Sequence, residues 1–336
     1  MKTEPMETVL APSPHLRSPD TIERVMYTVL IALVPGSLIG IYFFGLHAIR
    51  VMLISIVGCL VLEGIVLKLR GRDISPLKDG SAILTGLLLA MNLPSSTPGW
   101  MVMVGALVAI LLGKHVYGGL GYNPFNPALV ARVFLLISFP VAMTSWPEPK
   151  PFTFSLDTVT KATPLGEMKT NLLMTGSIGD IANIDLMAPF LGNFGGSLGE
   201  VSALALIVGG LFLLARKVIT WHIPVTFIVT VFVMTGMFWV INPQKFASPV
   251  FHILTGGLML GAFFMATDYV TSPVTNKGMI IFGVGCGAIT VFIRLFGGYP
   301  EGVSFAILLM NSVTPIIDQY TKPRTFGYLR EKKVVA

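Results

Sequence analysis

The sequence predicts an all-α polytopic membrane protein, and three observations lead to this fold class. Of its 336 residues, 53% are hydrophobic and only 12% are charged, about half the charged fraction of an ordinary soluble domain. The mean hydropathy is +0.77 over the whole chain. The 35 glycines are typical of membrane helices, which pack closely through small residues. The net charge of +6 does not indicate nucleic-acid binding, because the basic residues are scattered at the ends of apolar runs.

Apolar runs that can form membrane-spanning helices recur along the chain. A span needs about 20 mostly apolar residues, or fewer where the helix is broken. The sequence contains ten such runs, two of them short or interrupted, at 25–46, 49–67, 81–93, 99–117, 127–144, 199–216, 220–242, 248–266, 278–296 and 301–318. We therefore expect ten transmembrane helices.

The distribution of basic residues predicts the orientation of these helices. With the N-terminus in the cytoplasm, 17 of the 23 Lys and Arg residues lie inside and six outside, as the positive-inside rule requires. Both termini are then cytoplasmic. The expected segments are a cytoplasmic N-terminal segment, a first transmembrane repeat, an extracytoplasmic loop, a second transmembrane repeat and a cytoplasmic basic tail, at 1–24, 25–144, 145–198, 199–318 and 319–336.

Two pairs of similar stretches indicate an internal repeat. AILTG at 82–86 resembles HILTG at 252–256, and GGLGYNPFNPALVARVFLL at 118–136 has a counterpart in FGGYPEGVSFAILLM at 296–310. Five spans separate the copies, so the copies cross the membrane in opposite directions. Inverted repeats with broken helices place a functional site at the repeat interface. A chance match in Leu- and Gly-rich sequence is the alternative.

Polar stretches interrupt the apolar runs, and irregular backbone at membrane depth is tolerated only where protein or a water-filled cavity covers it. They are MNLPSSTPG, GYNPFNP and TDYVTSPVTNKG, at 91–99, 121–127 and 267–278. All are also compatible with loops at the membrane surface. In the second stretch, Asn123 and Asn126 precede a helix expected to begin at Pro127. The N–H groups at that helix start favour an anion or a polarised ring.

Seven ionisable residues lie in or near the spans: Glu63, Lys114, His115, Arg132, Asp268, Arg294 and Asp318. Intramembrane charge is a functional-site hypothesis by default, and Glu63 is the candidate for an ion path. All but Glu63 and Arg132 lie close to helix ends, where we expect snorkelling. Cys59 and Cys286 are expected to be buried, because two thiols alone cannot ligate an iron–sulfur cluster. No metal site is predicted, no nucleotide-binding or hydrolase motif is found, and no catalytic residue is assigned.

The expected extracytoplasmic loop contains the polar run DTVTKATPLGEMK, at 157–169. Thr163 is placed to cap a short amphipathic helix that has Pro164 at its first position. A phosphate on the Thr163 hydroxyl would also suit this place, since a helix N-terminus favours negative charge. A capped surface helix and a phosphate attachment site are therefore compatible.

This run resembles the flavin-attachment motif of RnfD, a membrane component of the Rnf electron-transport complex, and of the homologous NqrB subunit of the sodium-pumping NADH:quinone reductase. The family pattern is close to Asp-x-x-[Ser/Thr]-Gly-Ala-Thr, and the matching residues are Asp157, Thr160, Ala162 and Thr163, followed by Pro164 and Leu165. Lys161 stands where glycine is usual. The resemblance extends over nearly the whole chain, including SPHLRSPDT, GYNPFNPALVAR, TDYVTSPVTNKG and GYPEGVSFAILLMNSVTPIID, at 13–21, 121–132, 267–278 and 298–318.

The resemblance implies a fold similar to the urea and ammonium channels, with ten helices as two inverted five-helix repeats. It implies FMN bound covalently through a phosphoester at Thr163, and a second, non-covalent flavin such as riboflavin among the helices. The expected partners are the lipid bilayer, the other Rnf subunits (A, B, C, E and G) and a flavin transferase. The implied location is the bacterial cytoplasmic (inner) membrane. The implied function is electron relay in a ferredoxin:NAD oxidoreductase that moves Na⁺ or H⁺.

Two other classes of function remain compatible with the residues. A small-solute channel or transporter of the same fold would use DTVTKATPL only as a capped surface helix. A passive membrane scaffold for partner subunits is the third possibility. A stoichiometric flavin separates the redox role from both, while solute flux through the isolated chain would support the channel.

Overall fold

The computed structural model describes residues 21–149, 160–179, 187–192 and 195–323, and these residues are predominantly helical. The first half contains α1 (Ile22–Leu69), the 3₁₀ turn η1 (Ser75–Asp79), α2 (Ser81–Met91), α3 (Gly99–Leu107), the π-helix η2 (Val108–His115), α4 (Pro127–Ser138) and α5 (Pro140–Thr144). The connection to the second half contains β1 (Trp146–Pro147), β2 (Thr160–Lys161), α6 (Pro164–Thr175) and α7 (Met187–Leu191). The second half contains α8 (Ala203–Ala215), α9 (His222–Ile241), α10 (Pro249–Leu254), α11 (Leu258–Leu260), the π-helix η4 (Gly261–Met265), α12 (Asn276–Phe296) and α13 (Val303–Thr321).

The helices have the length and composition of an integral membrane protein. Among the described residues, α1, α9 and α12 are long and apolar enough to cross a bilayer. Shorter apolar helices cover Ser81–Met91, Gly99–His115, Pro127–Ser138 and Ala203–Ala215. The predicted class, a helical membrane protein, is confirmed.

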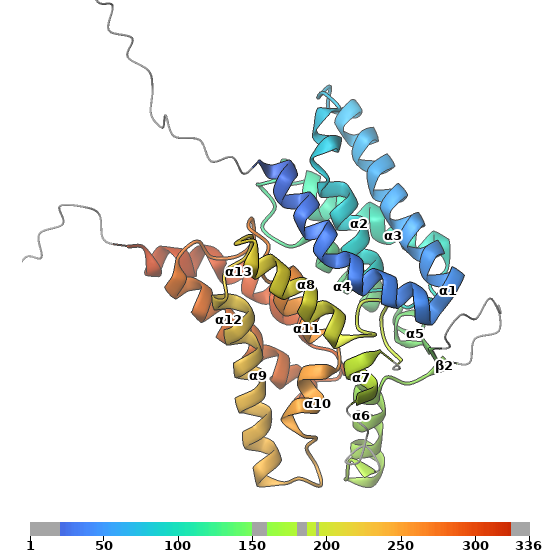
Figure 1. Ribbon diagram of the computed structural model, residues 1–336, viewed down its shortest axis with the longest axis vertical. Coiled ribbons are helices and arrows are strands. Elements are labelled where there is room, and N and C mark those ends of the chain that lie inside the picture. Colours follow the sequence, from blue (N-terminus) through green and yellow to red (C-terminus); the bar gives the residue numbers. More distant parts are fainter. Residues whose placement is uncertain (1–20, 150–159, 180–186, 193–194, 324–336) are drawn as a thin grey trace, which may run out of the picture.

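The first two apolar runs form one long helical element that bends in the middle. Within α1, Gly45 has φ 56° and ψ −134°, which interrupts the helical geometry. A residue with a Cβ rarely adopts a positive φ, so glycine suits this bend. The two halves of α1 diverge from the bend, as Figure 1 shows.

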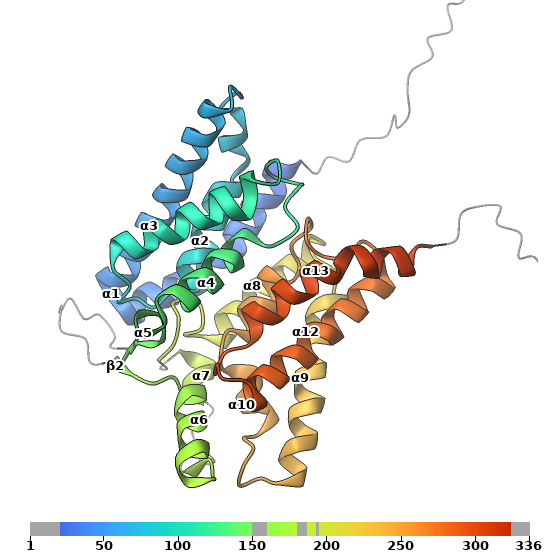
Figure 2. The same ribbon diagram turned by 180° about the vertical axis from the view of Figure 1, so that it is seen from behind.

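Each half of the chain forms its own helical group. In the first group, α1 packs against α2 and α3, and in the second, α9 packs against α12 and α10. Contacts of α1 with α8 and of α4 with α13 join the groups. Figures 1 and 2 show the start of α1 and the end of α13 toward one side of the molecule, away from β2 and α6.

The two ILTG stretches adopt different backbone conformations. In the first half, ILTG lies within the unbroken helix α2. In the second half, helix α10 ends at Leu254, Gly256 and Gly257 follow with φ values of 71° and 66°, and α11 begins at Leu258. The second copy therefore contains a break that places backbone carbonyl groups inside the protein.

Candidate functional site

The threonine of the DTVTKATPL motif caps helix α6, as predicted. The Thr163 side-chain oxygen accepts a hydrogen bond from the Gly166 N–H at 3.1 Å, and Pro164 is the first helical residue. Thr163 is only 5% exposed. Just before it, β2 pairs antiparallel with β1, so that Lys161 lies opposite Trp146 and Thr160 opposite Pro147. Asp157 lies outside the described residues.

Through β1, the motif is attached to the first half of the chain. The guanidinium carbon of Arg132 lies 5.7 Å from the centre of the Trp146 ring, within the range of a cation–π interaction. Arg132, on α4, also forms an ion pair of 2.9 Å with Glu301, just before α13. The Trp146 side chain is almost fully buried. These contacts fix β1, and hence the strand that leads into Thr163.

Helix α6 attaches the motif to the second half. Its buried residues share a small apolar cluster with the chain around α10, made of Leu165, Met168, Ile178, Ala247 and Phe251. Lys169 donates to the carbonyl oxygen of Tyr299 at 2.9 Å and lies 3.4 Å from that of Ile293, at the end of α12. Partial burial lowers the pKa of Lys169 from its ordinary value. The ammonium group satisfies carbonyls that a helix C-terminus leaves without partners.

Thr163 therefore lies where both helical groups are joined to the loop. Residues 160–161 are held by the first group through β1, and residues 165–169 are held by the second. Figure 1 shows α6 leaving β2 and descending beside α10. A group carried by Thr163 would be positioned by both groups of helices.

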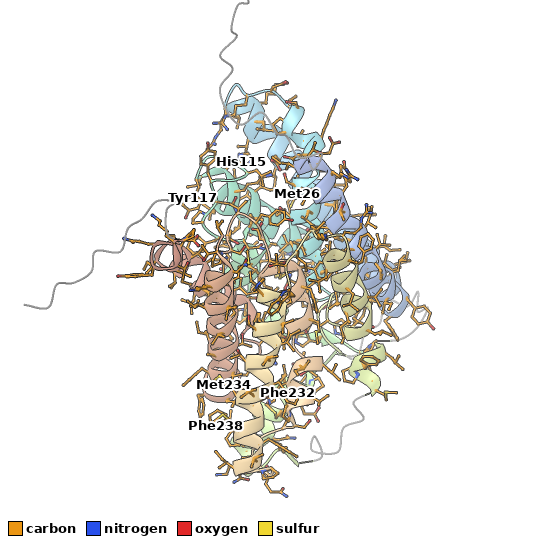
Figure 3. The ribbon with its side chains drawn as sticks, turned by 60° about the vertical axis from the view of Figure 1, so that its left-hand side comes forward. Met26, His115, Tyr117, Phe232, Met234 and Phe238 are labelled. Carbon is orange, nitrogen blue, oxygen red and sulfur yellow. The ribbon has the colours of Figure 1, made fainter. Side chains whose placement is uncertain are left out.

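A second candidate site surrounds the buried ion pair of the first half. Lys114, in η2, lies 2.6 Å from Glu63 and 2.7 Å from the hydroxyl oxygen of Ser81. His115 Nε2 lies 3.5 Å from the same Glu63 oxygen. The other Glu63 oxygen is buried and has no hydrogen-bond partner among the described residues. Figure 3 shows His115 at the same end of the molecule as Met26 on α1, distant from Phe238 on α9.

Snorkelling, predicted for the ionisable residues near helix ends, is wrong for Lys114, His115 and Arg294. Their exposed fractions are 2%, 4% and 1%. Arg294 donates to three backbone carbonyls of the second half, and Lys114 is neutralised by Glu63. The side chains turn inward because these acceptors compensate for lost water.

The two aspartates among these candidates hold the irregular stretch before α12, Asp268 from within the stretch and Asp318 from α13. Asp318 accepts a hydrogen bond from the Val274 N–H at 3.1 Å. Asp268 accepts from the Thr271 hydroxyl at 3.3 Å and from the Val270 N–H at 3.4 Å. These contacts hold the stretch 267–278 in place, which is the irregular segment expected there.

A cavity that is partly open to solvent is lined by residues of both halves of the chain. Its polar lining includes Ser81, Lys114, Asn123, Asn126 and Asp268. Helix α4 begins at Pro127, as predicted, and Asn126 caps it: its side-chain oxygen accepts from the N–H groups of residues 128 and 129 at 3.1 and 3.4 Å. The Asn126 amide also donates to the Met265 carbonyl at 3.3 Å. The start of α4 is thereby tied to η4.

Sequence reasoning missed the contacts that bring distant residues to the motif. In the sequence, Gly256 stands out only as part of the repeat, whereas in the structure Leu165 and the Arg294 guanidinium fill the place where its Cβ would lie. The first ILTG is followed by Leu87 and the second by Gly257. This second glycine is the feature of the sequence that indicates a broken helix. Cys59 and Cys286 are buried free thiols, as predicted.

Over nearly its full length, the chain is similar to proteins of one known family. The model of the NQR2, RnfD, RnfE family matches residues 9–327. The D subunit of the proton-translocating ferredoxin:NAD(+) oxidoreductase complex of Clostridium ljungdahlii is 47% identical over 326 residues, covering 96% of both chains. The Na(+)-translocating counterpart of Acetobacterium woodii is 44% identical over 329 residues, covering 98% of both. The D subunit of the ion-translocating oxidoreductase complex of Cronobacter sakazakii is 42% identical over 349 residues, covering 95% of this chain and 99% of its own. The chain therefore belongs to the NQR2, RnfD, RnfE family.

Proposed function

We propose that this protein is the RnfD component of an ion-translocating ferredoxin:NAD⁺ oxidoreductase, in which it relays electrons through FMN carried by Thr163. Support comes from relatives with corresponding names that match essentially the full chain. The observation that carries the flavin proposal is the position of Thr163 as the cap of α6, held by both helical groups. The other Rnf subunits (A, B, C, E and G) are the proposed partners.

The residues around Thr163 fit a phosphoester. The hydroxyl oxygen faces the first turn of α6, where the helix dipole favours a phosphate. A Cβ at Gly166 would lie 3.2 Å from this oxygen, so glycine keeps the space beside it open. The FMN would supply redox chemistry, and the protein would supply its position and a barrier to loss. A flavin transferase must form the ester.

The cavity lined by both halves of the chain is the proposed place for a second, non-covalent flavin such as riboflavin. Asn123 and Asn126 line this cavity and are buried. They offer amide groups beside the start of α4, where helix N–H groups favour a polarised ring. Apolar side chains from both groups, including Leu88 and Phe264, complete the lining.

The proposed architecture is two inverted five-helix repeats, similar to the urea and ammonium channels. Two features support it: the paired ILTG stretches, and the paired Gly-Gly/Tyr/Pro stretches that precede α4 and α13. In each half, a buried cation also reaches the region of the ILTG stretch: Lys114 in the first half and Arg294 in the second. We place both termini in the cytoplasm and residues 145–198 outside a bacterial inner membrane, on the distribution of Lys and Arg.

The transported ion is Na⁺ or H⁺, and the comparisons leave the choice open. The relatives of C. ljungdahlii and A. woodii are named for protons and for Na⁺, at similar identity to this chain. We propose the Glu63–Lys114–His115 cluster as part of the ion path, because it contains a buried carboxylate oxygen without a hydrogen-bond partner among the described residues.

The experiment compares complexes that contain wild-type or Thr163→Val protein. Ferredoxin-dependent NAD⁺ reduction and the coupled ion uptake are measured in inverted membrane vesicles. Loss of both activities, with the variant complex assembled, supports electron relay through Thr163. Unchanged activities, together with solute flux through the isolated chain in liposomes, would favour the alternative, a small-solute channel or transporter of urea-channel-like fold without a redox role.

A further inference from the structure

Arg294, near the end of α12, is a buried cation with no acidic partner in direct contact among the residues that the structure describes. It is 1% exposed, and the described ion pairs do not include it. Its guanidinium donates instead to the carbonyl oxygens of His252 at 2.5 Å, Gly256 at 2.8 Å and Thr255 at 2.9 Å. Burying a charge without strong hydrogen bonds is costly, so these three contacts explain how the residue is accommodated.

The Thr255 and Gly256 carbonyls belong to the break between α10 and α11, and the His252 carbonyl belongs to the last turn of α10 before it. This break exists because Gly256 and Gly257 both adopt positive φ, which turns the chain out of helical geometry. A carbonyl released by a broken helix needs another donor when it is buried. The planar guanidinium supplies several donors in a fixed geometry. Arg294 thus holds the break in one conformation.

The break forms part of the surface on which α6 is docked. Where a Cβ of Gly256 would be, the structure has the Leu165 side chain and, 2.7 Å away, a nitrogen of Arg294. Leu165 is two residues after Thr163 and is buried. From the other side, Lys169 contacts the backbone carbonyls of α12 around Arg294 itself. The two attachment points of α6 in the second half therefore both involve the neighbourhood of Arg294.

We propose that Arg294 is a positioning residue for the flavin tether: by holding the Gly256–Gly257 break, it forms the seat that fixes Leu165 and hence Thr163. This proposal rests on the proposed attachment of FMN to Thr163 for its functional meaning. The seat itself is a property of the chain, so it can be tested without flavin. Lysine in place of Arg294 keeps the charge but reaches fewer of the carbonyls.

The test measures hydrogen exchange of full-length protein in detergent, with every variant in a Thr163→Val background. Arg294→Gln is expected to speed exchange in α6 by about ten- to a hundredfold, since hydrogen bonds to charged groups contribute on that scale. Arg294→Lys is expected to give an intermediate increase. Exchange in α2 should not change. Arg50→Gln is the matched control, because Arg50 donates to one carbonyl, that of Thr97 at 3.1 Å, away from α6.

Unchanged exchange in α6 of a folded variant would overturn the proposal, as would an equal increase in α2, which indicates general loosening. If Arg294→Gln does not fold, Arg294→Lys decides. A second measurement uses protein with Thr163 intact and FMN attached. Lower flavin fluorescence anisotropy is expected in Arg294→Lys and not in Arg50→Gln, and equal anisotropy would contradict the proposal. If no FMN is attached in the wild type, the proposed function fails, whereas the exchange result still tests the seat.

Discussion

At the scale of single residues, the fate of a buried charge depends on the partners it finds. Lys114 has an ammonium–carboxylate contact of 2.6 Å to Glu63 and a contact of 2.7 Å to Ser81. Burial removes the hydration of both ions, and their attraction offsets this cost only while both are present. Removing one partner is therefore worse than removing both.

Lys114→Met is expected to destabilise the protein by about 3–5 kcal/mol, the usual cost of leaving one member of a buried ion pair without its partner. Thermal unfolding in detergent gives the comparison with Lys78→Met, a change at an exposed lysine. The double variant Lys114→Met with Glu63→Gln should recover part of the loss. If the double variant were less stable than Lys114→Met, the unpaired Glu63 would not be the cause of the loss of stability.

At the scale of elements, the starts of two helices could be predicted, because they depend on local sequence. Pro127 and Pro164 begin α4 and α6, and Asn126 and Thr163 cap them, because cap preference and proline geometry depend on neighbouring residues only. The partners of buried groups could not be predicted in this way. Glu63 and Lys114 are 51 positions apart, and their meeting depends on how α1 packs on its neighbours.

Asn126→Ala is expected to lower the stability by about 1–2 kcal/mol, since it removes the acceptor for two N–H groups at the start of α4 and the donor to Met265. Asn126→Ser keeps an uncharged acceptor at the cap position and loses the donor to Met265, so a smaller loss should follow. Thermal unfolding of both variants measures the difference. Equal stability of Asn126→Ala and wild type would mean that the cap has no energetic role.

At the scale of the whole molecule, the orientation in the membrane determines which compartment meets the Thr163 loop. The helical membrane protein could be predicted from composition, because a high apolar fraction and a low charged fraction extend over the entire chain. The junction at Thr163 was beyond prediction from local patterns: it requires Trp146, Arg132 and Glu301 on one side and Leu165 and Gly256 on the other. Packing of distant segments produces it.

The proposed topology predicts labelling from one side only. A membrane-impermeant maleimide added to intact cells, after permeabilisation of the outer membrane if one is present, should label Met174→Cys, at an 82% exposed position in α6. It should label Ser75→Cys, in the exposed turn η1, only in lysed cells. Cys59 and Cys286 are buried and should give little background. Labelling of Ser75→Cys in intact cells would show that the orientation is the reverse of the proposed one.

The most direct test of the central claim is whether Thr163 carries flavin. The purified chain, made alongside an active flavin transferase, is denatured and examined by in-gel flavin fluorescence and intact mass. We expect wild type and Thr163→Ser, which keeps the hydroxyl, to fluoresce and to be heavier by one FMN less water. Thr163→Val should do neither while its helices stay folded. A dark wild type of unmodified mass would contradict the flavin tether, leave Thr163 as a helix cap alone, and favour the channel.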